Sequence, residues 1–422
     1  MLSLLAIVVV AVGCNPSSNP DVACDPSGCI SLTKFAGNIF DELDGKVTGE
    51  VIMVGGTFPL VGGLARTNAD PPSFAMSILT PIDVASVGKV LTTVGVLQSL
   101  AKHNMTVDDK ILPYLWSDWQ KGKNIDTITF RDLLTHKAGF RSSCDSTYEG
   151  LKDLIQHDVK MPDKAVSSYH NCNFSIFREM IPFMEGASYS GTEDGRAQWS
   201  AAYYVNYMNA HVFTPLGMGN QACKSDPNTV AFSYPFPAGS AHGHDWGDTT
   251  LRCGAGGWVM SGRDLFEVVN DLANGNVLLT NVQKAEMNAS YPSSLGWDSS
   301  LTSDICPNPY VCKNGGLDDG YHYLRSYIGI FKCKVPVVVL INSKVPDISD
   351  DLTPLVKKAY KNAGVSESPG PCSAQPTLPP PPLPPTPSNG LKLVTPSPSL
   401  LPFKPALTVQ PMVEFTATPK AP

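Results

Sequence analysis

The sequence predicts an α+β fold: an α/β sandwich with an antiparallel sheet and an inserted all-helical subdomain. Strand patterns occur near both ends of the chain, at 47–63 and again at 327–332 and 335–341. The last of these is a nearly continuous β-branched run, whereas residues 91–285 show mostly helical periodicity. Strands at both ends with helices between them predict one sheet built from distant segments, into which the helices are inserted.

The ends of the 422-residue chain differ in composition from its middle. Residues 1–13 are apolar but too short to span a bilayer, which is typical of a signal or lipoprotein-type leader. Residues 14–30 are rich in Pro, Ser, Asp and Cys, and we interpret them as a linker. Residues 366–422 hold 17 of the 37 prolines, which predicts a disordered tail that favours extended conformations.

Residues 31–365 are expected to form the folded domain. We assign residues 31–90 and 286–365 to its sheet subdomain and residues 91–285 to its helical subdomain. Within the sheet subdomain, helical patterns at 31–44 and 350–363 predict two helices that pack against the sheet.

The cysteines and the leader predict an extracytoplasmic protein. Eleven cysteines fit an oxidising compartment, and Cys24–Cys29 and Cys306–Cys312 are the first disulfides that we expect, each closing a short loop. The segment Ala-Val-Gly-Cys14 resembles a lipoprotein cleavage box, although simple cleavage between small residues fits equally well. The chain is therefore expected to be secreted, or anchored at the cell surface or in the periplasm through a lipid on Cys14.

Charge and hydropathy exclude two classes of partner. The formal net charge is −7 and the Lys and Arg residues form no cluster, which argues against binding to nucleic acid. No internal run reaches the roughly 20 apolar residues that a membrane-spanning helix requires. A lipid on Cys14 is thus the expected route to a membrane.

A Ser-x-x-Lys pattern at Ser86 and Lys89 opens an apolar segment that we expect to be a buried helix. Residues three apart share a helix face, so the hydroxyl and the amine can come within hydrogen-bond distance. A serine nucleophile needs a neighbouring base, and a buried lysine can supply one if its pKa is lowered. The pattern is not specific by itself, because Ser31 and Lys34 match it on an expected exposed helix face.

Two later motifs make the pattern more informative. Tyr169 and Asn171 form a Tyr-x-Asn motif, and Lys313-Asn-Gly315 precedes the last pair of strands. In this order the three motifs resemble the signature of the penicillin-recognising serine hydrolases, which include class C β-lactamases, D-alanyl-D-alanine carboxypeptidases and related esterases. The resemblance covers about residues 31–363 and implies a β-lactamase/transpeptidase-like fold.

The resemblance implies a role for each motif residue. Ser86 would be the nucleophile and Lys89 its base, Tyr169 would pass a proton to the leaving group, and Asn171 would position Lys89 and the substrate amide. Lys313 would bind a substrate carboxylate. The backbone N–H groups of Ser86 and Gly316 would form the oxyanion hole, with Asn314 and Gly315 beside them at the substrate-binding strand. No metal or other cofactor is implied, and the expected partner is a small-molecule or peptide substrate.

One departure from the signature keeps three functions open. Asn314 stands where the family usually has Thr or Ser, so a hydroxyl that binds the substrate carboxylate in β-lactamases is missing. The leading hypothesis is a serine hydrolase that acts through an acyl-enzyme on an ester, amide or β-lactam-like substrate. The alternatives are a non-catalytic binding or scaffold protein that retains the fold, and a D-alanyl-D-alanine carboxypeptidase.

Several other polar residues are expected to have structural roles. We interpret His136 as a buried, hydrogen-bonded histidine at a helix end. His242, His244 and Asp245 have the residue types of a metal site, but their glycine-rich surroundings favour a loop. Asn173 lies in a glycosylation motif beside the expected active site, and we expect it to be unmodified because a glycan there would crowd the cleft.

Overall fold

The computed structural model describes residues 19–25, 28–164, 166–289, 294–298, 311–346 and 351–365. All of these belong to one compact unit, residues 1–374, and a second unit at 375–422 lies outside the described residues. The expected leader, the proline-rich tail and Cys306 also lie outside them. Among the described helices, none combines the length and the apolar character needed to cross a membrane.

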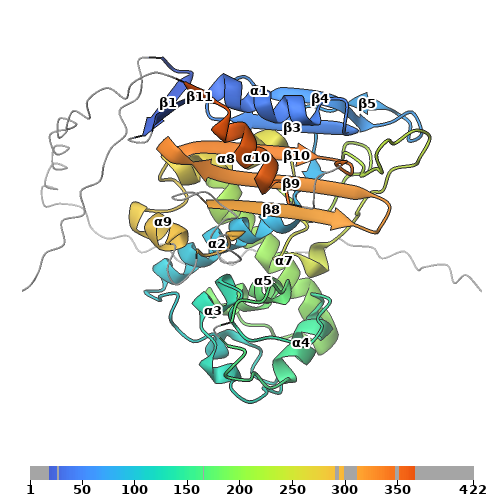
Figure 1. The fold of residues 1–422 in the computed structure, drawn as a ribbon. Coiled ribbons are helices and arrows are strands. Elements are labelled where there is room, and N and C mark those ends of the chain that lie inside the picture. Colours follow the sequence, from blue (N-terminus) through green and yellow to red (C-terminus); the bar gives the residue numbers. More distant parts are fainter. Residues whose placement is uncertain are drawn as a thin grey trace, which may run out of the picture. The chain divides into compact units, whose positions relative to one another are not determined.

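The α+β fold predicted from the sequence is confirmed. Its main element is a six-stranded antiparallel sheet in the order β5-β4-β3-β10-β9-β8, in which strands from both ends of the chain lie side by side (Figure 1). The strands are β3 (Gly49–Val54), β4 (Leu60–Arg66), β5 (Phe74–Ala75), β8 (Val311–Asp318), β9 (Tyr323–Phe331) and β10 (Val335–Ile341). A short pair, β6 (Ile82–Asp83) and β7 (Val259–Met260), lies apart from this sheet.

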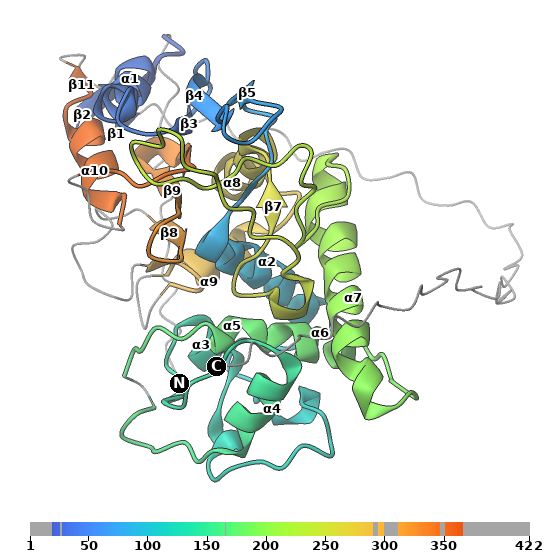
Figure 2. The ribbon, with the colours of Figure 1, turned by 90° about the vertical axis from the view of Figure 1, so that its right-hand side faces the viewer.

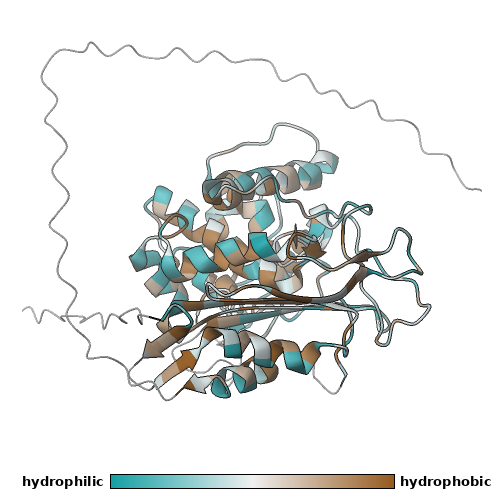
Figure 3. Cartoon of the chain, turned by 90° about the horizontal axis from the view of Figure 1, so that it is seen from above, coloured by the Kyte–Doolittle hydropathy of each residue, from teal (hydrophilic) through white to brown (hydrophobic). Residues whose placement is uncertain are grey.

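Strand β10 explains the continuous apolar run in the sequence. Val337, Val339 and Ile341 belong to the core formed with α1 and α10, whereas Val338 and Leu340 belong to the core on the opposite face. Every residue of the strand is buried, because helices cover both faces of the sheet. Figure 3 shows these apolar strands between helices whose outer surfaces are hydrophilic.

Helices α1 (Leu32–Leu43) and α10 (Thr353–Lys361) pack against one face of the sheet, as the sequence predicts. The Ser31 hydroxyl accepts a hydrogen bond from the Lys34 N–H and so caps α1. Ser31 therefore has a structural role as an N-cap, and its match to the Ser-x-x-Lys pattern does not indicate a second nucleophile.

The helical region begins with α2 (Gly88–Lys102), which runs between the sheet and helices α3 (Phe130–Leu134), α4 (Tyr148–Gln156), α5 (Cys172–Ser175) and α6 (Phe177–Met184) (Figure 2). The later helices are α7 (Arg196–Met208), α8 (Gly262–Asn274) and α9 (Asn281–Asn288). Twelve of the fifteen residues of α2 are buried. Burial all round the helix fits its position between two layers.

The expected subdomain boundary at residue 285 is wrong. Helix α8 packs against β10 and β3, and its Leu265, Val268 and Leu272 belong to the core on that face of the sheet. An amphipathic helix has the same periodicity whichever surface it covers, so its packing partner could not be deduced from the sequence.

The expected linker at 14–30 also needs correction. Strands β1 (Val22–Asp25) and β2 (Gly28–Ser31) pair with each other, and β2 also pairs with β11 (Gly364–Val365) at the far end of the domain. The predicted Cys24–Cys29 disulfide joins the first two strands. These strands are short and their composition is typical of a loop, so a pairing partner more than 300 residues away was not apparent from the sequence.

Candidate active site

Ser86 lies in a tight turn that begins the buried helix. The 3₁₀ helix η1 (Ala85–Val87) leads directly into α2, and Ala85 has a φ of 48°, a left-handed conformation that usually costs a non-glycine residue about 1–3 kcal/mol. The Asp83 carboxylate accepts a hydrogen bond from the Ala85 N–H at 2.7 Å, and the Ser326 hydroxyl donates one to the Val84 carbonyl at 2.8 Å. These contacts fix the turn that presents Ser86.

Strand β8 passes very close to this turn, and Gly315 makes the approach possible. A Cβ atom at Gly315 would lie 2.8 Å from the Val84 carbonyl oxygen and 3.0 Å from the Ser86 nitrogen. The glycine of the third motif is therefore required so that the strand can lie against the nucleophile turn. That proximity suits the expected oxyanion hole of the Ser86 and Gly316 N–H groups, whose role remains a prediction.

Lys89 is completely buried, and its amine has three polar neighbours. Lys89 Nζ lies 3.0 Å from Ser86 Oγ, 2.9 Å from Asn171 Oδ1 and 2.7 Å from the Ala255 carbonyl oxygen. An ammonium group would donate to all three, whereas a neutral amine would keep two donors for Asn171 and Ala255 and turn its lone pair to Ser86. Burial, assisted by the positive charge of Lys313, lowers the pKa of Lys89.

Tyr169 completes the contacts of Ser86. Its hydroxyl donates a hydrogen bond to Ser86 Oγ at 2.7 Å, and its ring centroid lies 4.9 Å from Lys89 Nζ and 5.0 Å from Lys313 Nζ. Although the residue as a whole is 41% exposed, the hydroxyl lies against the nucleophile. Burial of the phenol would raise the pKa of Tyr169, but the two lysines outweigh it and the pKa is lowered.

The segment that carries Tyr169 and Asn171 is held by two groups whose contribution the sequence did not reveal. A disulfide joins Cys172, the first residue of α5, to Cys144. The His136 ring packs 4.5 Å from the ring of Tyr169, and His136 Nδ1 accepts a hydrogen bond from the His170 N–H at 3.2 Å. Burial and the nearby Lys89 keep the pKa of His136 well below its usual value, so a neutral ring supports Tyr169.

Other contacts agree with the structural roles expected from the sequence. The Asn173 amide is buried and lies 3.1 Å from His136 Nδ1, which leaves no room for a glycan. Tyr204 and Tyr207, which begin two further Tyr-x-Asn matches, donate or accept hydrogen bonds within the core, at Thr92 and at the Gly95 carbonyl. Neither of these tyrosines lies at Ser86.

Lys313 lies in edge strand β8 and is paired with a carboxylate that the sequence analysis missed. Lys313 Nζ donates to Asp298 Oδ1, and the Asn314 N–H donates to Asp298 Oδ2 at 2.8 Å. Both charged side chains are buried, with exposed fractions of 2% for Lys313 and 8% for Asp298. Burial alone would lower the pKa of Lys313, but the neighbouring Asp298 reverses this effect and raises it.

The Asn314 side chain does not point to the substrate in the way that the family's hydroxyl would. Its amide nitrogen donates to the Thr353 hydroxyl at 2.8 Å, and its amide oxygen accepts from the Leu352 N–H at 2.9 Å. Both contacts are to the start of α10. The prediction that Asn314 binds substrate therefore applies at most to its backbone.

A cavity of about 370 Å³ lies above these groups. Ser86, Tyr169, Lys313 and Gly316 line it together with Asp298 and Arg325. The structure thus brings Ser86, Lys89, Tyr169, Asn171 and Lys313 together around one cleft, as a nucleophile, two amines, a phenol and an amide. Such a set can remove a proton from Ser86 and return it to a leaving group without a metal ion.

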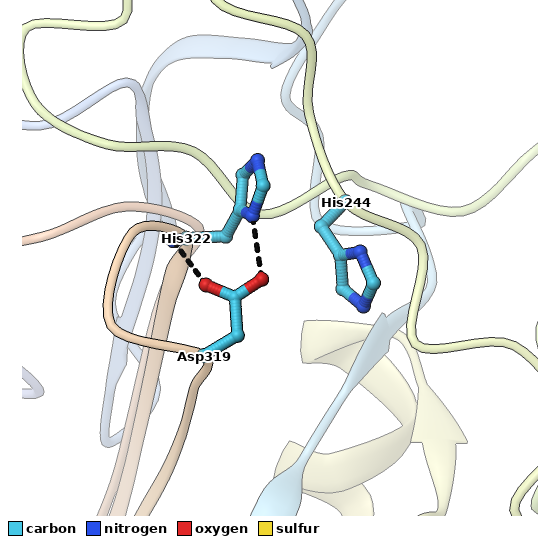
Figure 4. A group of neighbouring side chains, drawn as sticks. All are labelled: His244, Asp319 and His322. Carbon is cyan, nitrogen blue, oxygen red and sulfur yellow. Dashed lines mark hydrogen bonds and ion pairs between the residues drawn. The ribbon is translucent and has the colours of Figure 1, made fainter. Parts of the chain in front are cut away.

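A separate cluster has the residue types of a metal site. His244, from the loop interpreted as non-metal in the sequence, lies near Asp319 and His322 of the β8–β9 turn, and their ligand atoms are within 4.8 Å of one another (Figure 4). His322 Nδ1 is hydrogen-bonded to Asp319 Oδ2 at 2.8 Å and His322 Nε2 to the His242 carbonyl at 3.1 Å. Since both nitrogens of His322 face acceptors, the cluster fits hydrogen bonding between two loops better than it fits a bound ion.

Comparisons with known proteins give one family and one fold. A family model described as Beta-lactamase matches residues 60–358, whereas no curated protein sequence matches the chain. A class C beta lactamase from Rhodobacter sphaeroides is similar in structure, with 17% identity, a TM-score of 0.58, and coverage of 78% of this chain and 99% of the other.

Two further solved structures have the same fold. A beta-lactamase/D-alanine carboxypeptidase from Yersinia pestis has 16% identity and a TM-score of 0.58, covering 78% of this chain and 97% of the other. A D-stereospecific amidohydrolase from Streptomyces has 18% identity and a TM-score of 0.53, covering 78% and 98%. At these identities the likeness establishes the fold.

Proposed function

Because the chain belongs to the Beta-lactamase family, within the penicillin-recognising serine hydrolases, we propose that it hydrolyses a small ester, amide or β-lactam-like substrate through an acyl-enzyme. The observation that supports this most directly is the position of Ser86 Oγ, 3.0 Å from Lys89 Nζ and 2.7 Å from the Tyr169 hydroxyl. A serine with a buried amine on one side and a phenol on the other has the neighbours that an activated nucleophile needs.

In the first step Ser86 Oγ attacks the substrate carbonyl carbon while its proton moves to the neutral amine of Lys89. Asn171 and the Ala255 carbonyl hold that amine in place before and after the transfer, because each accepts one of its N–H groups in both protonation states. The N–H groups of Ser86 and Gly316 would stabilise the oxyanion.

In the second step the carbonyl–leaving group bond breaks and the leaving atom takes a proton. Tyr169 is hydrogen-bonded to Ser86 and interacts with both Lys89 and Lys313, so it is placed to pass the proton from Lys89 to that atom. Attack of water on the acyl-enzyme, with its proton taken by the same groups, then releases the acid and restores Ser86.

A fluorophosphonate probe and turnover of p-nitrophenyl acetate test this proposal. Wild-type protein should gain one covalent label, seen by intact mass spectrometry, and Ser86→Ala should gain none. Ser31→Ala is the matched control, because Ser31 and Lys34 have the same spacing but Ser31 caps α1. It should be labelled like wild type. An unlabelled wild type, or equal labelling of Ser86→Ala, would refute the proposal.

We further propose that the protein acts outside the cytoplasm. Three disulfides, Cys24–Cys29, Cys144–Cys172 and Cys223–Cys253, join described residues, and such bonds persist in oxidising compartments. The apolar leader supports the same location. Fractionation of cells that express the full chain would test this, and recovery of the protein in the reduced form from the cytosol would contradict it.

A further inference from the structure

We propose that Asp298 determines the substrate class of this hydrolase: by pairing with Lys313, it makes the cleft select esters or amides with an uncharged leaving group over those that carry a carboxylate there. This inference rests on the proposed function, since it concerns the leaving group of the Ser86 reaction. It differs from what the family resemblance implies, namely that Lys313 receives a substrate carboxylate.

The contacts of Asp298 show that the position beside Lys313 is occupied by a carboxylate of the chain itself. One carboxylate oxygen accepts from Lys313 Nζ and the other from the Asn314 N–H. Both charged residues are nine-tenths or more buried. A substrate carboxylate that displaced Asp298 would leave it buried without its cation, and an unpaired buried charge is strongly unfavourable.

The side chain of the second motif residue that would bind such a carboxylate, Asn314, also has its own partners within the protein, although the residue lines the cavity. The Asn314 amide is hydrogen-bonded to Leu352 and Thr353 at the start of α10, on the side away from Ser86. The cation and the polar side chain of the third motif are therefore both engaged within the protein. Neither contact needs a substrate.

The other charges of the cleft do not compensate for this. Arg325 lines the cavity, but its guanidinium donates to the Leu317 and Leu324 carbonyls and lies 3.6 Å from the Asp318 carboxylate. Asp318 and Asp351 line the same cavity as Asp298. The negative field of these two carboxylates is a separate and more general cause of such a preference, so the test has to distinguish it from the Lys313–Asp298 pair.

Two esters that differ only in this charge provide the test. The acetyl esters of 3-hydroxybenzamide and of 3-hydroxybenzoate share the acyl group and the position of the leaving oxygen, but the second carries a carboxylate. Wild-type kcat/KM should favour the benzamide ester by about tenfold or more, the effect of one unfavourable charge contact. In Asp298→Asn the carboxylate ester should gain about tenfold in kcat/KM, mainly through a lower KM, because Lys313 is then available to it.

The control is Asp351→Asn, which removes one negative charge from the same cleft and leaves the Lys313–Asp298 pair in place. Its ratio of the two kcat/KM values should stay within about threefold of wild type. If Asp298→Asn merely loosened the fold, both esters would slow together and the ratio would not move, which would overturn the inference. An equal change in Asp351→Asn would overturn it too, because the general field of the cleft would then explain the preference.

The wild-type measurement keeps the inference testable even where Asp298→Asn does not fold. A wild type that hydrolyses both esters at the same kcat/KM, or prefers the carboxylate ester, refutes the role of Asp298 while leaving the serine hydrolase intact. Failure of the proposed function has a different signature: neither ester is hydrolysed, or Ser86→Ala hydrolyses both as wild type does.

Discussion

Replacing Lys89 by methionine tests the proposed chemistry most directly. Methionine has nearly the length of the lysine side chain and no charge, so it can fill the fully buried site without a cavity. The change removes the amine from Ser86 Oγ, Asn171 Oδ1 and the Ala255 carbonyl, its three hydrogen-bond partners. The Tyr169–Ser86 hydrogen bond does not involve Lys89 and should remain.

The size of the expected effect follows from these contacts. A positioned general base contributes about 10²–10⁴-fold to the rate, or about 3–5 kcal/mol of transition-state stabilisation. The loss of stability should be limited, because the cost of leaving Asn171 Oδ1 and the Ala255 oxygen unsatisfied, about 1–3 kcal/mol each, is partly offset by removal of a buried amine. Lys89→Met should therefore fold and bind substrate but acylate slowly.

The assay is kcat/KM for p-nitrophenyl acetate as a function of pH. Burial lowers the pKa of Lys89 below 10.5, so the neutral, active amine is populated at a lower pH than for an ordinary lysine, and wild-type kcat/KM should fall as acidification protonates it. Lys89→Met should lose both the rate and this acid limb. Lys102→Met is the matched control, because Lys102 lies on the same helix with its side chain 54% exposed. The kcat/KM of this variant should stay within about twofold of wild type. If Lys89→Met retained more than a tenth of wild-type kcat/KM, or kept the acid limb unchanged, Lys89 would not be the base.

Three further predictions concern the surroundings of the site. Burial raises the pKa of Asp83 to about 7 from 3.8, so folding stability should fall as pH rises through this interval, by about 4 kcal/mol at most. Asp83→Asn keeps the acceptor for the Ala85 N–H and should weaken this pH dependence in thermal melts at pH 5 and pH 8. An equal change in melting temperature between the two pH values in both proteins would contradict this prediction. Replacing Cys144 and Cys172 by serine opens a loop of 28 residues and should destabilise the protein by about 3.5 kcal/mol in urea unfolding, and an unchanged midpoint would show that the disulfide is not formed in solution. Treatment with a chelator should leave both the melting temperature and the esterase rate unchanged, because both ring nitrogens of His322 are hydrogen-bonded and the cluster of His244, Asp319 and His322 is not expected to hold a metal ion. A loss of stability or activity that zinc restores would show that the cluster does bind a metal.

How much of this site the sequence could predict depends on how far apart in the chain the contacting residues lie. Ser86 and Lys89 are three residues apart on one helix start, so their proximity follows from helix geometry. The positions of Tyr169 and Lys313 could be inferred only through the order of the family's motifs, because no local rule joins residues separated by more than 80 positions. The Cys144–Cys172 pair could not be assigned, since several cysteines compete for each partner and spacing does not fix connectivity.

Asp298 shows a different limit. A single aspartate after Gly-Trp has no pattern that indicates a partner, and its pairing with Lys313 appears only when β8 comes beside it in the fold. The sequence did contain a related signal at Asn314. Because Asn314 replaces a hydroxyl residue of the family signature, it already argued against binding of a substrate carboxylate at the third motif. The departure was visible, whereas its physical reason was not.

Asp298 and the Asn314 side chain both hold strand β8 in place, and this has a consequence for catalysis. Asp298 holds the Asn314 N–H and the Lys313 amine, while the Asn314 side chain fixes the strand to α10. Strand β8, with Gly315 against the Ser86 turn, is therefore held in place before any substrate arrives. If Lys313 depended on a substrate carboxylate as its counter-charge, strand β8 would become fully ordered only when substrate binds. Here Asp298 supplies the counter-charge, so the strand is already ordered in the free protein. Preorganisation of this kind favours small, neutral substrates, because they have little binding energy of their own to contribute to ordering the site.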